Sequence, residues 1–114
     1  MEKDNKKAEL EIRKEIAALK IESFTMYGDS SHSWLEVPFA LLELLKIDGL
    51  ITECSYQSRD GKKVYLEEDV DAYTFIIAYR DALHSREVER IPIVDRYSEH
   101  SFVRALPRYA RKIG

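Results

Sequence analysis

The sequence of 114 residues has little cysteine, glycine or proline: one cysteine, Cys54, four glycines and three prolines. A single cysteine cannot form an internal disulfide or supply a thiolate metal site, so we expect a reducing, cytoplasmic setting. No apolar run approaches the roughly 18 residues that a membrane-spanning helix needs. The N-terminus is charged rather than apolar, so we expect neither a secretory signal nor a membrane-bound protein.

Recognisable chemical motifs are also missing. There is no glycine-rich phosphate loop and no Walker lysine. The three histidines, His32, His84 and His100, are scattered, and no pair has a spacing suited to a metal. Cys54 falls inside a predicted strand, where a small core residue is the expected role. We therefore predict a non-enzymatic protein with no catalytic residues, no cofactor and no metal ligands.

What the sequence does contain is typical of one globular domain. Hydrophobic residues make up 45% and charged residues 34% of the chain, so a real core is expected. The formal net charge of −3 is too small to favour or exclude a nucleic-acid partner by itself. Only the distribution of charge along the chain can separate the functional alternatives.

Residues 2–20 are densely charged and carry a narrow apolar stripe at helical spacing, formed by Ala8, Ile12, Ile16 and Leu19. We predict a helix whose last turns pack on the domain. The alternative is the seam of a homodimer, but about two heptads are short for a coiled coil. The predicted division is an appended N-terminal helix over residues 1–20 and a single α+β domain over residues 21–114.

The next segments alternate between strand and helix signals. Residues 21–27 alternate in polarity and predict a strand. Trp34 then begins an extended stretch that leads into Pro38, which suits the first turn of an apolar helix over residues 39–47. Gly49 is the expected left-handed end of that helix. We predict that Trp34 is buried and structural.

A β-hairpin is the best-specified local element. An Asp-Gly pair at residues 60–61 lies between β-prone runs over residues 50–57 and 64–66. A two-residue turn would require positive φ at both residues and would pair Tyr56 with Tyr65. A one-residue shift would exchange the two faces, so the buried face stays open.

A long apolar helix over residues 67–83 follows the hairpin. Four carboxylates crowd its predicted start: Glu67, Glu68, Asp69 and Asp71. A hard-cation site is one interpretation, but it needs ligands that converge from a loop. Acidic side chains in a first helical turn also stabilise the helix dipole, and this simpler role is the one we expect.

The C-terminal part reads as an edge strand and a short turn of helix. Residues 88–94 alternate, and Pro92, which lacks an N–H, predicts an edge position. Residues 95–101 are polar and predict a connection. Residues 102–106 predict a helical turn that ends at Pro107. Together these elements predict an α+β fold, with a small, mainly antiparallel sheet of about four strands packed by one long helix.

Basic residues cluster at two places, the hairpin tip and the C-terminal segment. We expect the two groups to remain separate and not to form one nucleic-acid-binding face. With neighbouring aromatic and histidine side chains they make up the candidate interaction surface: Arg59, Lys62, Lys63, Tyr97, His100, Arg104 and Arg108.

Four stretches carry a resemblance. They are SHSWLEVP (31–38), SYQ (55–57), VYLEEDVDA (64–72) and FVRALPR (102–108). In these stretches the chain resembles small proteins encoded by bacteriophages and other mobile elements, mostly of unassigned function. The resemblance implies a small accessory factor that acts in the host cytoplasm by binding host or defence machinery.

The first functional hypothesis is therefore a protein that binds a host protein, as an inhibitor in one version. Seven tyrosines and one tryptophan agree with it, since these residue types are favoured at interface centres. The alternative is a small DNA-binding module of the excisionase or winged-helix type. Against it, the predicted helix over residues 39–45 offers only Glu43 outside its apolar positions. A hydrolase or nuclease using His32 or His100 is the third hypothesis.

Overall fold

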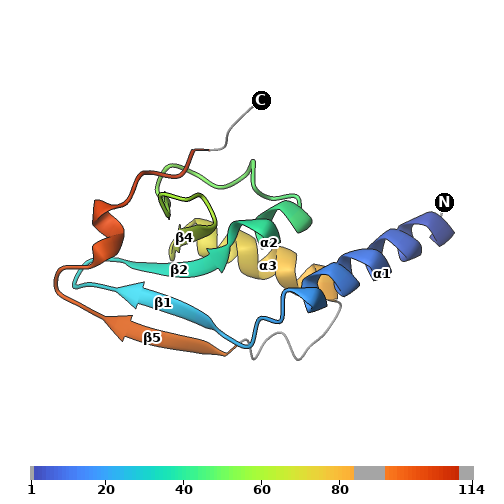
Figure 1. The fold of residues 1–114 in the computed structure, drawn as a ribbon, viewed down its shortest axis with the longest axis horizontal. Helices are drawn as coiled ribbons and strands as arrows, with labels where there is room; N and C mark the ends of the chain where they lie inside the picture. Colours follow the sequence, from blue (N-terminus) through green and yellow to red (C-terminus); the bar gives the residue numbers. More distant parts are fainter. Residues whose placement is uncertain (1, 84–91, 111–114) are drawn as a thin grey trace.

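The computed structural model describes residues 2–83 and 92–110, with side chains from residue 8 onward. Within these residues the fold is α+β, with a five-stranded mixed sheet and three α-helices (Figure 1). In chain order the elements are α1 (Glu2–Ala18), β1 (Phe24–Gly28), β2 (Ser33–Pro38), α2 (Phe39–Leu44), β3 (Tyr56–Gln57), β4 (Lys63–Glu67), α3 (Asp71–Leu83), β5 (Ile93–Tyr97) and the 3₁₀ helix η2 (Phe102–Ala105).

The strands lie in the order β3-β4-β2-β1-β5. The pairings β1–β2, β2–β4 and β3–β4 are antiparallel, whereas β1–β5 is parallel. The edge position expected from Pro92 is confirmed, and the Pro92 carbonyl accepts a hydrogen bond from Phe24 N at 2.9 Å. The strand lies further along than predicted: Asp95–Tyr97 belongs to β5 and not to a connection. Positions 88 and 91 lie outside the described residues.

The sheet buries a different set of side chains on each face. Leu35 and Val37 of β2 belong to a large cluster of aliphatic and aromatic side chains, which all three α-helices also supply. The neighbouring Trp34 points to the other face, because successive residues of a strand alternate. There it packs with Tyr56, Tyr65 and Val103 in a second cluster, under the segment that contains η2. The predicted burial of Trp34 is confirmed, since its exposure is 2%.

The last turns of helix α1 pack against the body. Ile16 is buried in the same cluster as Leu35, with Ile12 and Leu19 partly buried beside it. Arg13 Nε donates to the carbonyl of Ala82 in α3 at 3.3 Å. Figure 1 shows the N-terminal part of α1 projecting away from the sheet. Independent folding of the rest of the chain without this helix stays a prediction.

Helix α2 begins as expected and ends differently. Pro38 is its N-cap, and Leu41 and Leu42 are fully buried. The left-handed residue that follows the helix is Lys46, with φ of 59°. The prediction of Gly49 in this role is wrong, because the chain turns before it reaches the glycine.

The hairpin register is confirmed, since Tyr56 pairs with Tyr65. Its turn is of another type than expected: only Gly61 has positive φ, and Gly61 N donates to the Ser58 carbonyl at 2.9 Å. The first strand is also much shorter than residues 50–57, because β3 contains only Tyr56–Gln57. Cys54 consequently lies in a turn and is exposed, which corrects its expected core position.

Helix α3 begins at Asp71, four residues later than predicted. Glu67 is the last residue of β4, and the chain from 68 to 70 forms a turn. Three of the four carboxylates therefore precede the helix, so the predicted first-turn role is wrong for them. No helix among the residues that the structure describes is long and apolar enough to cross a membrane.

Candidate functional site

A pocket of 350 Å³ lies where β2 begins and β4 ends. Trp34 and Glu67 pair directly across these two strands, so their side chains share one face of the sheet. All four stretches that carry the resemblance contribute to the pocket. Its lining residues are His32, Trp34, Cys54, Tyr56, Glu67, Asp69, Val70, Arg104 and Arg108.

One side of the pocket is built from arginines that lie over aromatic rings. The Trp34 and Tyr56 rings meet edge to face, with centroids 5.9 Å apart. Arg104 Cζ lies 5.1 Å from the Trp34 ring centroid, and Arg108 Cζ lies 4.6 Å from that of Tyr56. Cation–π attraction at these distances holds both guanidinium groups against the sheet while leaving them exposed.

The C-terminal segment carries both arginines because it returns alongside β3. Gln57 N donates to the Pro107 carbonyl and Tyr109 N donates to the Ser55 carbonyl, both at 2.9 Å. Val103, in η2, is fully buried against the sheet. Arg108 Nη1 donates to the Glu53 carbonyl at 3.2 Å. Backbone pairing therefore sets the height of each arginine above the aromatic rings.

Asp29 links this segment to the loop between β1 and β2. Its carboxylate accepts hydrogen bonds from Arg104 Nε at 2.5 Å and from Arg104 Nη2 at 3.3 Å. The same carboxylate accepts from the backbone N–H groups of Ser31 and His32, each at 2.9 Å. The Arg104 hydrogen bond, followed by these backbone bonds, lowers the pKa of Asp29 well below its usual value. Asp29 thus positions Arg104 and the backbone of His32 together.

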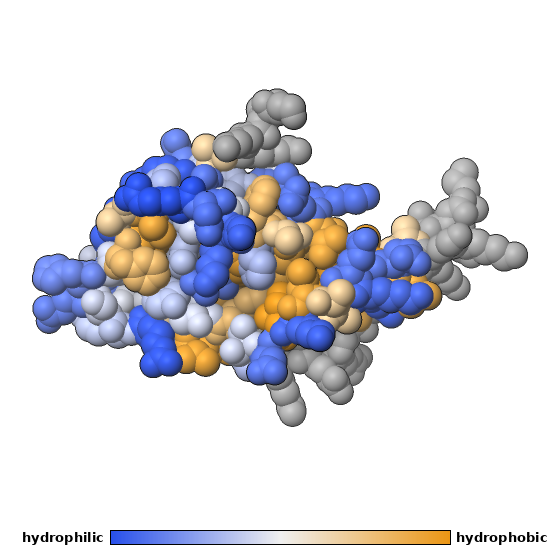
Figure 2. Space-filling model, viewed as in Figure 1, coloured by the Kyte–Doolittle hydropathy of each residue, from blue (hydrophilic) through white to orange (hydrophobic). Residues whose placement is uncertain are grey.

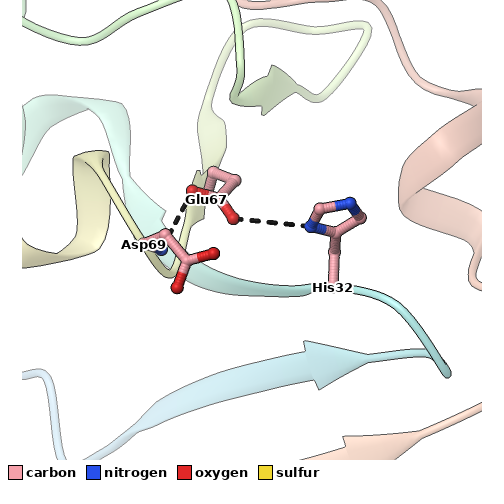
Figure 3. Close-up of side chains that lie close together, drawn as sticks. All are labelled: His32, Glu67 and Asp69. Atoms are coloured by element: carbon pink, nitrogen blue, oxygen red, sulfur yellow. Dashed lines mark hydrogen bonds and ion pairs between the residues drawn. The ribbon is translucent and has the colours of Figure 1, made fainter.

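The opposite side of the pocket is acidic and contains one histidine (Figure 3). Glu67 Oε2 accepts hydrogen bonds from Asp69 N at 2.9 Å and from Val70 N at 3.1 Å. Glu67 Oε1 is buried and has no hydrogen-bond partner among the described residues. It faces His32 Nδ1 at 3.6 Å. One ligand atom each of His32, Glu67 and Asp69 lies within 4.8 Å of the others.

A buried polar network supports the acidic side from beneath. Ser55 Oγ accepts from Glu67 N at 3.0 Å and donates to Asp71 Oδ2. Asp71 also accepts from Thr52 N and from Thr52 Oγ1, the latter at 2.8 Å. Ser55 is fully buried and Asp71 is 1% exposed. This network fixes the end of β4, and with it the position of Glu67.

The predicted interaction residues fall at three separate places. Arg104 and Arg108 line the pocket, and Arg59 Nη2 lies close to them, donating to the Ala105 carbonyl at 3.3 Å. The two hairpin lysines line a different groove of 460 Å³, together with residues 19–25 and 36–38. Tyr97 and His100 line a third hollow beside η2. Lys62 and Lys63 therefore belong to the groove, and Tyr97 and His100 belong to the hollow beside η2.

Sequence reasoning did not recognise the other pocket residues as a group. His32 directly precedes β2 and Trp34 lies in β2 two residues later, which is the spacing of side chains on a common face of an extended chain. The sequence predicts Glu67 and Asp69 at the start of a helix, and that position does not indicate that they converge on His32. The register between β2 and β4, which pairs Trp34 with Glu67, was the missing information.

No family model, no curated protein and no solved structure matches the chain. Apart from the sequence resemblance, a functional proposal therefore rests on the geometry of the pocket. Exposed guanidinium groups, an exposed histidine and a buried carboxylate oxygen are groups that bind polar ligands or protein side chains.

Proposed function

We propose that this is a small phage or mobile-element accessory protein that binds a host protein through the pocket and its rim, without catalysing a reaction. A host-defence protein is the partner class that the resemblance implies, and inhibition is the corresponding outcome. The proposed setting is the cytoplasm of the host cell. A homodimer stays a further proposal, since a second copy could contact α1.

The observation that carries the proposal is the ordering of exposed arginines over aromatic rings. Arginine and the aromatic residues are enriched at the energetic centres of protein interfaces. A guanidinium group already fixed by Asp29, or by the Glu53 carbonyl, loses less conformational entropy when it meets a partner. Arg104 and Arg108 are therefore suited to recognise carboxylates or backbone carbonyls of another protein.

Apolar surface next to the pocket adds support. Val70 lines the pocket and is 45% exposed. Tyr73 and Ile77 follow at helical spacing along α3 and are also exposed. Figure 2 shows another apolar patch over η2, where Phe102 is 48% exposed. Exposed apolar and aromatic side chains beside an arginine-bearing pocket support protein binding, because aromatic residues and arginine are enriched at protein interfaces.

The test compares Arg108→Glu with Lys14→Glu, a matched charge reversal on the exposed face of α1. Proteins captured from bacterial lysate by the wild type would be identified by mass spectrometry, and the affinity of each purified partner would then be measured. We expect Arg108→Glu to weaken binding by at least about tenfold, because it replaces a charge-assisted contact by repulsion. Lys14→Glu should keep the wild-type affinity. Equal affinity of both variants would refute the proposed surface.

DNA binding remains the second candidate, because one observation favours it. The Arg59–Ala105 hydrogen bond brings one hairpin arginine beside Arg104 and Arg108. Lys63 is less available, since it forms an ion pair with Glu36 at 3.8 Å. We expect weak, salt-sensitive binding without sequence preference in fluorescence anisotropy at two salt concentrations. Sub-micromolar, sequence-selective binding that is lost in a triple Arg59, Lys62 and Lys63→Ser variant would promote this candidate above ours.

A further inference from the structure

We propose that His32, Glu67 and Asp69 bind a divalent transition-metal ion of the zinc class at the acidic side of the pocket. The site lies in the pocket proposed to bind a protein, but its metal binding can be measured without a partner and does not rest on the proposed function. The three residues come from the end of the β1–β2 loop, the end of β4 and the turn before α3 (Figure 3). A metal ion there would join the β1–β2 loop to that turn.

The first observation is the buried oxygen of Glu67. Glu67 is 8% exposed, and its Oε1 atom has no hydrogen-bond partner among the residues that the structure describes. Buried polar atoms nearly always have a partner, because an unsatisfied one loses its hydration without compensation. Oε2 of the same carboxylate is fully used by two backbone N–H groups. Glu67 is thus firmly positioned with one oxygen directed at the histidine.

The second observation is the spacing of the donor atoms. Oε1 of Glu67 and Nδ1 of His32 are 3.6 Å apart, too far for a hydrogen bond. Two ligands of a tetrahedral zinc ion, with bonds of about 2.0–2.1 Å, are separated by roughly 3.3–3.5 Å. The observed gap is therefore close to the separation that a shared metal ion would impose.

Asp69 completes the set from an exposed position. Its backbone N–H is bonded to Glu67 Oε2, which fixes the main chain beside the site. The three ligand atoms lie within 4.8 Å of one another, a wider spacing than the ideal value allows. Asp69 is exposed, so rotation of its side chain can shorten this distance without moving the backbone.

The donor chemistry selects the class of ion. One imidazole nitrogen and two carboxylate oxygens suit zinc and manganese, and they do not suit copper(I), which prefers sulfur ligands. Two backbone N–H groups orient Glu67 and the Asp29 carboxylate orients the His32 backbone, as supporting groups do in metal sites. Three protein ligands leave a coordination position for water or a partner group. Arg108 in the same pocket opposes the cation, so we expect weaker binding than at a four-ligand site.

The test is calorimetric titration of EDTA-treated, desalted protein with zinc chloride and, separately, manganese chloride. We expect one ion per chain, and at least about tenfold weaker binding in His32→Ala, Glu67→Gln and Asp69→Asn. The matched controls are Glu68→Gln, the neighbouring exposed acid, and His100→Ala, a histidine outside the pocket. Both should keep the wild-type affinity.

A second measurement separates metal ligation from folding. The amide introduced by Glu67→Gln retains an oxygen that can accept from Asp69 N and Val70 N, so this variant without metal should unfold near the wild-type temperature. Added zinc should raise the Tm of the wild type and of Glu68→Gln, but not that of His32→Ala. Absence of binding by the wild type, or equal affinities in His32→Ala and the controls, would overturn the site.

Discussion

Trp34 and Leu35 are consecutive residues that are both buried, on opposite faces of the same strand. Leu35 is 1% exposed and lies in a cluster of aliphatic and aromatic side chains supplied by strands and helices. Trp34 lies in a smaller cluster, where its main contacts are Tyr56, Val103 and the guanidinium group of Arg104. One face of the sheet is therefore sealed by helices, and the other by a short segment.

The two kinds of cover differ in what keeps them in place. The helical cover is made of apolar contacts, which need no partner of fixed direction. The segment has a buried apolar anchor, Val103, and otherwise depends on directional contacts, such as the Arg104–Asp29 ion pair and the Gln57–Pro107 backbone bond. Polar groups at such a cover reach the surface, so the segment-covered face is where a binding site can form.

The largest expected effect tests whether the segment-covered face is a real core. Trp34→Ala should lower the free energy of unfolding by about 3–5 kcal/mol, and Leu35→Ala by about 2–5 kcal/mol, as for other large-to-small core changes. Urea denaturation followed by circular dichroism measures both. A stable Trp34→Ala variant, or native wild-type tryptophan fluorescence that is red-shifted and fully quenchable, would show that this face is not packed as described.

The second prediction concerns the network beneath the pocket. Asp71→Asn should lower the free energy of unfolding by about 2–3 kcal/mol, because hydrogen bonds to a charged acceptor are lost in a buried place. Asp81→Asn, an exposed acid on the same helix, should change it by less than about 0.5 kcal/mol. Both values come from urea denaturation at neutral pH. A change at Asp71 as small as that at Asp81 would mean that the network does not stabilise the end of β4.

Local signals in the sequence predicted the parts of the fold that depend on neighbours along the chain. The pairing of Tyr56 with Tyr65 followed from counting outward from the Asp-Gly pair, and the edge position of β5 from Pro92. The short β3 could not be predicted in this way. Asp71 accepts the backbone N–H of Thr52, 19 residues away, so the chain there does not extend as a strand.

The pocket itself depends on contacts that are more distant still. Arg108 meets the Glu53 carbonyl across 55 residues, and Arg104 meets Asp29 across 75 residues. No periodicity or spacing encodes such contacts. The sequence identified Arg104 and Arg108 as surface residues, but the aromatic rings beneath them and the acidic side opposite become visible only when the C-terminal segment is seen beside β3.

A pH-dependent prediction tests the tether of the segment. The pKa of Asp29 is lowered in the folded state, so the folded protein binds fewer protons at this group than the unfolded chain does. Its contribution to stability is present above the unfolded value of about 3.9 and is lost as the pH falls below it. In Arg104→Gln the main cause of the lowering is absent, so the Tm should fall less steeply between about pH 5 and pH 3.

Arg108→Gln is the matched control, because its guanidinium group bonds to a carbonyl and not to a carboxylate. It should retain the wild-type dependence of Tm on pH. If Arg104→Gln also retained that dependence, the ion pair would not be what ties the segment to the β1–β2 loop.

The smallest expected effect comes from Lys46→Gly, at the end of a helix that covers one face of the sheet. This change should leave the other face unaltered. Lys46 follows α2 with φ of 59°, a left-handed conformation that costs a residue with a Cβ atom roughly 1–2 kcal/mol. Glycine avoids this cost but loses more entropy on folding, so Lys46→Gly should raise the free energy of unfolding by about 0.5–1 kcal/mol. Gly49 does not have positive φ, so Gly49→Ala creates no backbone strain of this kind and is the control.

Urea denaturation measures the gain in the free energy of unfolding of Lys46→Gly. An unchanged emission maximum of Trp34 shows that the segment-covered face is unaffected. A loss of stability in Lys46→Gly would indicate that contacts of the lysine side chain, and not its backbone, determine how α2 ends.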